Sequence, residues 1–412
     1  MFHWQKHRKY WGNMTFNVAK IRADFPALKH TKCFLDSGAS AQKPQCVIDA
    51  VNAYSDTTYA NVHRGTYPMS EKMTLAFEAV RGRVATLLNA QENEIVFTKN
   101  VTEAINLVAH SYGSLINDGA DIIISAMEHH ANIVPWQMLC ERRSINLKIC
   151  PVLDNGDLDY TAFESMLSDK TALVAMIHTS NVLGTVVDVK RICLLAHNVG
   201  AKVLIDGSQA IVHQSVDVVD IDADFYCFTA HKLYAPTGVG VLMGKYDLLQ
   251  SMPPFLGGGD MIEIVSFEKT TYAQAPAKFE AGTPPIQQVI GLGCAIDYVS
   301  ALDMDDVMAH EHSLYALAVK RISNIEGVRI MGTAPNKAPI LSFVVKGIHS
   351  FDIAELLSVA GVCVRVGHHC AEPLMQRFDV QGTIRASFAM YNNVDDVEVF
   401  YSALNKAVEM LR

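Results

Sequence analysis

Short apolar runs alternate with amphipathic segments through the middle of the chain. The apolar runs predict buried strands, and the amphipathic segments between them predict helices. The expected strands are 94–98, 121–125, 147–152, 171–178, 202–206 and 224–229, and the expected helices are 102–113, 131–143, 159–168 and 188–199. Near-continuous apolar strands joined by helices are typical of a parallel or mostly parallel sheet that is covered on both faces. The central part of the chain is therefore predicted to be an α/β domain.

The pattern changes on either side of this core. Helical periodicity also marks 44–60, 70–89 and 285–302, whereas strands and helices after residue 303 follow an α+β order: helix 306–324, strands 328–331 and 340–345, helix 351–360, strand 362–366 and helix 394–411. We therefore expect a large domain at 33–302 and a smaller C-terminal domain at 303–412, with 14–32 packing against the smaller one. Residues 1–13 are basic and aromatic, unlike a secretory signal, and are expected to be a disordered extension of unidentified purpose.

Composition narrows the function classes. The 412 residues are 50% hydrophobic, which is ample for a large core, and a net charge of −9 argues against a nucleic-acid partner. No apolar run is long enough to cross a bilayer, so no membrane association is expected. The nine cysteines have no regular spacing, which indicates a reducing, cytoplasmic compartment and no disulfide framework.

Polar residues follow the predicted strands at the points where the strands end. They are Thr98 and Asn100, Glu128 to His130, His178 to Asn181, Asp206 with Gln209, and His231 with Lys232. The carboxyl ends of parallel strands share one edge of a sheet, and ligands of open α/β sheets bind there. This edge is therefore the expected ligand site.

Two of these residues indicate a particular cofactor. Lys232 ends a buried strand, where burial lowers the pKa of an amine and frees it for Schiff-base chemistry. Asp206 ends the preceding strand in KVLIDGSQ. Pyridoxal phosphate needs this combination, a lysine for its aldehyde and a carboxylate for its ring nitrogen. An ordinary salt bridge at the strand edge is the alternative interpretation of the pair.

Two further strand ends could serve the same ligand. The segment TKNVTEAIN (98–106) joins a strand to a helix whose N-terminal N–H groups, with the Thr102 hydroxyl, could hold a phosphate; a simple Thr102 N-cap is the alternative, and the segment lacks the P-loop pattern. His129 could stack on a pyridine ring and move protons. A metal ligand or a capping residue is the alternative for His129, although adjacent residues such as His129 and His130 seldom bind one metal together.

The segment RVGHHCAEPLM (365–375) contains a candidate nucleophile. Cys370 follows two histidines and a glycine, a setting in which a thiolate can form and attack. A metal site of His368, His369 and Cys370 is the rival, but no second ligand group is spaced to complete it, so no metal is predicted. The other cysteines lie mostly in apolar runs and are expected to be structural. Arg385, in an apolar stretch, could clamp a substrate carboxylate or form a structural ion pair.

Taken together, the motifs resemble a known family. SAMEHHANIVPWQ, HTSNVLGTV, LIDGSQA, TAHKLYAPTGVGVL, FLGGGDMI, FEAGTP and RVGHHCAEPLM are similar to group II cysteine desulfurases of the SufS/CsdA type. These are class V-aminotransferase-like enzymes of pyridoxal-phosphate fold type I, with an aspartate-aminotransferase-like large domain. The resemblance runs from about residue 18 to the C-terminus.

The resemblance implies a role for each site residue. Lys232 carries pyridoxal 5′-phosphate, Asp206 pairs with its ring nitrogen, and His129 stacks on the ring. The remaining implied cofactor contacts are Gln209 at the ring oxygen, Val101, Thr102, Thr229 and His231 at the phosphate, and Gly257 and Thr283 reaching into the partner subunit's site. Asn181, Arg385 and Arg365 bind the substrate carboxylate, and Cys370 accepts the sulfur.

The implied reaction is a sulfur transfer that converts L-cysteine to L-alanine and leaves a persulfide on Cys370. A homodimer and a SufE-like sulfur acceptor, serving iron–sulfur cluster assembly, are the implied partners. Three positions depart from the family pattern: Val101 replaces a common threonine, so one phosphate contact is expected through the backbone alone, Thr229 replaces a serine, and Glu372 places a charge near Cys370.

Three other functions are compatible with parts of this pattern. Selenocysteine lyase activity would use the same site, and another class V reaction, such as an aminotransferase, would not need Cys370. A non-catalytic sulfur-carrier scaffold would bind no cofactor, but it leaves the combination of Lys232, Asp206 and His129 without a purpose.

Overall fold

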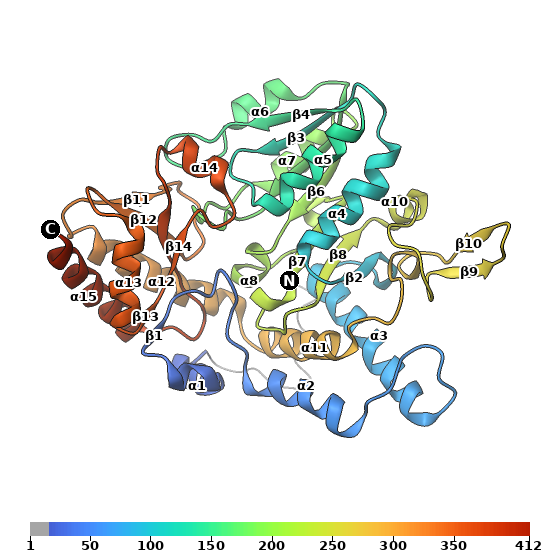
Figure 1. Cartoon of the computed structure of the whole chain (residues 1–412), viewed down its shortest axis with the longest axis horizontal. Coiled ribbons are helices and arrows are strands. Elements are labelled where there is room, and N and C mark those ends of the chain that lie inside the picture. Colours follow the sequence, from blue (N-terminus) through green and yellow to red (C-terminus); the bar gives the residue numbers. More distant parts are fainter. Residues whose placement is uncertain (1–15) are drawn as a thin grey trace.

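A seven-stranded sheet forms the centre of the computed structural model, which describes residues 16–412 (Figure 1). Its strand order is β2–β8–β7–β6–β5–β3–β4, and every neighbouring pair is parallel except the two that involve β8. The strands are β2 (Ile95–Thr98), β3 (Asp121–Ser125), β4 (Asn146–Cys150), β5 (Thr171–Ile177), β6 (Lys202–Asp206), β7 (Phe225–Thr229) and β8 (Gly240–Gly244). The predicted α/β class and mostly parallel sheet are confirmed.

Strand β8 is the one member of this sheet that the apolar pattern missed. It begins with a glycine directly after the turn-rich loop 235–239, so the loop signal concealed a strand of five residues. β8 returns antiparallel to β7, with Thr229 opposite Gly240. Because β8 also pairs antiparallel with β2, the strands β2 and β7 point the same way and end at the same edge.

Alternate residues of the strands feed two separate cores. On β7, Tyr226 and Phe228 enter one apolar cluster, whereas Phe225 and Cys227 enter the other. This period of two is the geometry of a strand buried on both faces. Both faces of the sheet are therefore buried, and only its edges are left for a ligand.

Helices cover both faces of the sheet. Those of the large unit are α2 (Gln45–Thr57), α3 (Pro68–Leu88), α4 (Val101–Ser111), α5 (Val134–Arg142), α6 (Tyr160–Met166), α7 (Val189–His197), α8 (Ala210–His213), α9 (Val218–Ile221), α10 (Tyr246–Ser251) and α11 (Ile286–Ser300). Side chains of α4 and α5 complete one core, and side chains of α3, α7 and α11 complete the other. A hairpin of β9 (Ile262–Val265) and β10 (Thr270–Tyr272) projects away from this body (Figure 1).

The C-terminal part forms a second sheet with helices against it (Figure 1). Its antiparallel strands lie in the order β11 (Val328–Met331), β12 (Ile340–Val345), β15 (Thr383–Ser387) and β14 (Arg365–Gly367). The helices are α12 (Met304–Ile322), α13 (Ser350–Val359), α14 (Glu372–Arg377) and α15 (Val394–Leu411). The strand expected at 362–366 is interrupted: Val362–Cys363 is β13, which pairs with another strand, and β14 begins at Arg365.

The N-terminal segment contacts both parts of the molecule. Helix α1 (Val18–Ala23) places Arg22 against Asp396 of α15 at 2.8 Å, and β1 (Cys33–Phe34) pairs with β13. The Phe25 ring packs against Tyr298 of α11 and against Tyr391. The domain boundaries proposed from the sequence stay a prediction, and the extension at 1–13 lies outside the described residues. Within residues 16–412, no helix combines the length and apolarity that crossing a membrane requires.

Candidate active site

Asp206 and Lys232 lie on neighbouring strand ends at the edge predicted for a ligand. Asp206 is the last residue of β6, and Lys232 ends the short turn η6 (Ala230–Lys232) that follows β7. Burial lowers the pKa of Lys232 to about 8, although the nearby Asp206 carboxylate opposes this shift. The Oδ1 of Asp206 accepts a hydrogen bond from the Ser208 N–H at 3.0 Å. The pair therefore combines an amine of unusually low pKa with an oriented carboxylate.

A glycine beside Asp206 leaves room for an aromatic side chain. A Cβ added to Gly207 would lie 2.1 Å from the ring of Tyr226, a fully buried residue of β7. The Tyr226 hydroxyl in turn forms a hydrogen bond of 3.1 Å with Nδ1 of His178. Gly207 is required at this position for close packing behind Asp206, not for an unusual backbone angle.

His129 directly follows a buried carboxylate that is fixed by three hydrogen bonds. The Glu128 side chain accepts hydrogen bonds from Ser125 Oγ at 2.5 Å, Asn132 Nδ2 at 2.7 Å and Ile177 N at 2.9 Å. The next residue, His129, caps the turn η5 (His130–Asn132) by accepting the Ala131 N–H at its Nδ1. Nδ1 is therefore unprotonated.

The imidazole of His129 is neutral near pH 7. Burial and the charge of Lys232 lower its pKa to about 4, although the Asp206 carboxylate opposes this shift. A neutral flat ring at this strand edge is suited to stacking against an aromatic ligand.

Two strand ends at the same edge of the sheet, those of β7 and β2, provide groups that an anion could bind. The Oγ1 of Thr229 and the Nδ1 of His231 are buried and have no hydrogen-bond partner among the described residues. Helix α4 begins nearby. Its start is close to the end of β7, because Gly240 of β8 lies so near the backbone of Asn100 that an added Cβ would be 2.4 Å from it. These features combine polar donors with a helix N-terminus, which favours a phosphate.

The start of α4 corrects one interpretation from the sequence. The N-cap is Asn100, whose Oδ1 accepts the Glu103 N–H at 2.9 Å. Thr102 is therefore not the cap; it lies in the first turn with an exposed side chain, next to a buried Val101. Since another residue satisfies the helix end, the Thr102 hydroxyl is left for other contacts.

The loop at 36–43 covers the ends of β6 and β7. Gln209 Nε2 donates to the carbonyl of Gly38 at 2.8 Å, and the Ala41 N–H donates to the carbonyl of His231 at 3.1 Å. The buried hydroxyl of Ser208 has no partner among residues 16–412. Gln209 is thus held at the site by a loop that is distant in the sequence.

Two arginines come together at an acidic residue that the sequence analysis did not identify. Arg385 is only 2% exposed and donates from Nη1 to the carbonyl of Asn181 at 2.9 Å and from Nη2 to Asp36 at 3.3 Å. Arg365 approaches the same carboxylate at 3.7 Å. The Nε of Arg385 and the Oδ1 of Asn181 are buried without partners in the described part of the chain. The position of Asp36 directly after a short apolar run was the only available signal.

Cys370 is the exposed one of nine free cysteines. His369 and Cys370 both have left-handed backbones, with φ of 54° and 56°. The turn is tied to the large unit, because the carbonyl of His369 accepts Asn181 Nδ2 at 2.8 Å and the carbonyl of Cys370 accepts the His130 N–H at 2.7 Å. The sulfur therefore reaches the surface from a turn whose backbone is fixed.

Gly257 and Thr283 lie on exposed loops near the β9–β10 hairpin. Gly282 N donates to the carbonyl of Gly259 at 2.9 Å, which joins the two loops. The role expected for Gly257 and Thr283 in another subunit's site stays a prediction.

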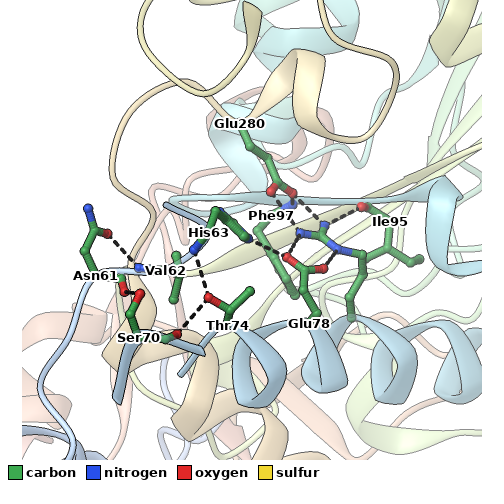
Figure 2. A network of polar contacts seen from close by, with 10 residues as sticks. Asn61, Val62, His63, Ser70, Thr74, Glu78, Ile95, Phe97 and Glu280 are labelled. Atoms are coloured by element: carbon green, nitrogen blue, oxygen red, sulfur yellow. Dashed lines mark hydrogen bonds and ion pairs between the residues drawn. The ribbon is translucent and has the colours of Figure 1, made fainter. Parts of the chain in front are cut away.

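The Thr283 loop is anchored by Glu280. Figure 2 shows Glu280 and Glu78 approaching one guanidinium group, that of Arg81 on α3, with Arg81–Glu280 hydrogen bonds of 2.7 and 3.0 Å. Glu280 also accepts the Phe97 N–H of β2 at 2.7 Å. These contacts border a cavity of about 570 Å³ that His63, Arg64 and Asp260 also line. The network ties an exposed loop to the central sheet.

The groups at the strand edge fit pyridoxal phosphate. An amine with a lowered pKa suits its aldehyde, a carboxylate suits its ring nitrogen, and the unpaired Thr229 Oγ1 and His231 Nδ1 suit its phosphate. Arg385 and Asn181, which each have an unpaired atom, are hydrogen-bonded to one another, and Asn181 also holds the turn of Cys370. The structure thus brings together the predicted lysine, aspartate, arginine and cysteine.

The comparisons with known proteins cover nearly the whole chain. The model of the family described as aminotransferase class-V matches residues 33–400. A probable cysteine desulfurase of Vibrio cholerae is 46% identical over 405 residues, covering 97% of this chain and 100% of the relative, and a cysteine desulfurase of Dickeya dadantii is 46% identical, covering 96% and 98%. The solved structure of the cysteine desulfurase CsdA from Escherichia coli is similar with a TM-score of 0.92 and 39% identity, covering 97% of this chain and 100% of that one.

Proposed function

The chain belongs to the class-V aminotransferase family, and we propose that it works as a cysteine desulfurase that moves the sulfur of L-cysteine to Cys370 and leaves L-alanine. The resemblance drawn from the sequence motifs is thereby confirmed at the level of the family and of the enzyme class. Pyridoxal phosphate is the cofactor. The observation that carries the proposal for this chain is that its exposed cysteine, Cys370, lies on a turn that Asn181 and His130 tie to the strand ends of the candidate site.

When bound, the cofactor supplies an electron sink that weakens bonds next to the substrate amine. Lys232 would hold the cofactor and, once freed, its amine would move the α-proton. Asp206 would pair with the ring nitrogen, and the neutral His129 would stack on the ring. The phosphate would be held by Val101, Thr102, Thr229 and His231, and the ring oxygen by Gln209. These assignments are supported by the lowered pKa of Lys232 and by the unpaired Thr229 and His231 atoms.

Substrate orientation is assigned to the arginine pair. Arg385, with its unpaired Nε, and Asn181, with its unpaired Oδ1, face the α-carboxylate and α-amine end of L-cysteine, and Arg365 adds charge from the exposed side. A guanidinium group binds a carboxylate through two parallel hydrogen bonds, which fixes the direction of the rest of the substrate. The substrate sulfur is then directed toward Cys370.

The sulfur transfer needs no oxidant or reductant besides L-cysteine and the Cys370 thiolate. The Cys370 thiolate attacks the substrate sulfur, an S–S bond forms, and the substrate C–S bond breaks with its electron pair left on the carbon. That carbon takes a proton, so the products are L-alanine and a Cys370 persulfide. Exposure of Cys370 lets a second protein collect the outer sulfur.

The proposed reaction also requires a protein that accepts the sulfur and a second subunit that completes the site. A SufE-like acceptor would take the persulfide sulfur and pass it to iron–sulfur cluster assembly in the cytoplasm. A homodimer would place Gly257 and Thr283 of one subunit at the other subunit's cofactor, and the exposure of both residues supports this arrangement.

Absorbance spectroscopy with a product assay tests the function. Purified protein is expected to be yellow, to change its spectrum on addition of L-cysteine, and to form alanine together with sulfide when a reductant is present. Cys370→Ala is expected to keep the spectral change and lose alanine formation. Alanine formation that survives in Cys370→Ala would favour another class V reaction, and faster turnover of L-selenocysteine that is independent of Cys370 would favour a lyase.

A further inference from the structure

We propose that His130 is the positioning residue of the Cys370 turn: it holds the nucleophile through its backbone and through its ring. This inference rests on the proposed function, because it concerns the sulfur transfer to Cys370. His130 was considered from the sequence only as a neighbour of His129 in a metal site. The structure instead brings it against a segment that lies about 240 residues further along the chain.

Two hydrogen bonds connect His130 to the turn. The His130 N–H donates to the carbonyl of Cys370 at 2.7 Å, and the Glu372 N–H donates to Nε2 of the His130 ring at 3.1 Å. They enclose Cys370 and Ala371 from both sides. Because an imidazole nitrogen accepts only when it carries no proton, the ring must be neutral with its proton on Nδ1.

The conformation of the turn explains why such a clamp is needed. His369 and Cys370 both adopt left-handed backbones, a conformation that is unfavourable for residues other than glycine. Two in succession persist only where surrounding contacts determine them. The turn has one internal hydrogen bond, from the Ala371 N–H to the His368 carbonyl at 2.9 Å, and the Asn181 bond to the His369 carbonyl anchors one side of it; the clamp by His130 anchors Cys370 and the Glu372 end.

The two histidines next to Cys370 do not have this role. The ring of His369 is buried and is bound through Nε2 to the carbonyl and hydroxyl of Thr383. The side chain of His368 is exposed. His130 is thus the histidine whose ring contacts the backbone on the far side of Cys370, while the ring of the adjacent His129 caps the local turn through the Ala131 N–H.

The expected consequence is a selective effect on sulfur transfer. Loss of the ring acceptor would free the Glu372 end of the turn without touching Lys232, Asp206 or Arg385. Because misplacement of a reacting group by about 1 Å can cost roughly 100-fold in rate, we expect His130→Ala to slow alanine formation by about 10- to 100-fold. The KM for L-cysteine and the first spectral change should stay as in the wild-type holoenzyme.

Single-turnover kinetics of the holoenzyme test whether alanine formation slows while substrate binding is unchanged. His130→Gln is the rescue variant, because the glutamine Oε1 can accept the Glu372 N–H from about the place of Nε2, and it should recover most of the rate. His312→Ala, on the exposed face of α12, is the matched control and should behave as wild type. An alanine rate that is unchanged in His130→Ala, or a glutamine variant as slow as the alanine variant, would overturn the proposal.

Hydrogen exchange gives an independent readout that does not depend on activity. In the wild-type protein, the Glu372 amide should exchange slowly, and exchange in the peptide 368–373 should speed up in His130→Ala and slow again in His130→Gln. Unprotected exchange at Glu372 in the wild type would overturn the proposal even if the alanine variant does not fold. A wild-type enzyme that forms no alanine would instead refute the proposed function, so the two failures are distinguishable.

Discussion

Arg365 lies directly opposite Arg385 on the antiparallel strands β14 and β15. Two like charges in register repel one another unless an anion lies between them. Asp36 supplies one carboxylate, at 3.7 Å from Arg365 and 3.3 Å from Arg385, and burial raises the pKa of Asp36 although both arginines oppose this shift. A substrate carboxylate would be the second anion at this pair.

The two arginines should differ in their importance for substrate binding. Arg385→Lys keeps the charge but loses the guanidinium fork of a residue that is 2% exposed, so we expect the KM for L-cysteine to rise about tenfold or more. The side chain of Arg365 is 47% exposed, and Arg365→Lys should change KM by about fivefold at most. Steady-state kinetics of both variants measure the ratio. Equal effects would contradict the assignment of Arg385 as the main carboxylate contact.

Cofactor loading should depend on pH through Lys232. The folded-state pKa of this amine is lowered to about 8 from an ordinary value of 10.5, chiefly by burial. Only the neutral amine reacts with an aldehyde, so the loading rate should rise with pH and level off above about pH 8. Stopped-flow absorbance of apoenzyme mixed with pyridoxal phosphate measures it, with Lys232→Ala as the control that forms no covalent product. A rate still rising steeply at pH 10 would contradict a buried amine.

The lowered pKa of Lys232 should also make the stability of the apoenzyme depend on pH. Because burial depresses the folded-state pKa of Lys232, the folded apoenzyme disfavours the charged amine. Its stability should therefore be lower below about pH 8 and should gain as pH rises from 8 toward 10.5. Lys232→Met should remove this gain, which urea unfolding of the apoenzyme at pH 7.5 and 9.5 would show.

Gly207→Ala should damage the site without altering a polar group. The added methyl would lie 2.1 Å from the Tyr226 ring, which is fully buried and cannot move aside freely. Overpacking of this kind costs typically about 1–3 kcal/mol, and here the strain falls on the residue after Asp206. We expect a lower melting temperature and weaker cofactor retention. Gly259→Ala, with open space around its added carbon, should leave the melting temperature unchanged; an equal effect would refute the packing argument.

The Arg81 network should contribute far more to stability than a surface ion pair of similar chemistry. The side chains of Arg81 and Glu280 are 7% and 11% exposed, whereas those of Arg191 and Glu164 are 46% and 45% exposed. Removal of one partner of a buried pair typically costs about 3–5 kcal/mol, so Arg81→Met should lower the free energy of unfolding by about that amount. Arg191→Met should change it by about 1 kcal/mol or less.

Urea unfolding at one fixed protein concentration compares the two variants. Fixed concentration matters because a dimer would make apparent stability depend on it. Similar losses in Arg81→Met and Arg191→Met would show that burial does not separate the two pairs.

Local patterns were sufficient wherever the signal lay within one element. The run DIIIS at 121–125 and the helix at 394–411 were placed with their exact bounds, because periodicity reports how one segment is buried. The boundary of α4 was misread at Thr102 because Asn100 and Thr102 are both good capping types, and only the backbone decides between them. Strand β8 was missed because its flanking glycines resemble a turn.

The sequence by itself determined the α/β class and the edge at which the strands end, and it supplied Lys232, Asp206, His129 and Cys370 as the candidate site residues. These follow from burial periodicity and from the chemistry of single side chains, which are properties of local sequence. The tertiary structure alone decided that Asp36 joins Arg385 and that His130 holds Cys370. Such contacts join residues that are hundreds of positions apart. Periodicity reports how one segment is buried, and it does not report which distant segments come into contact.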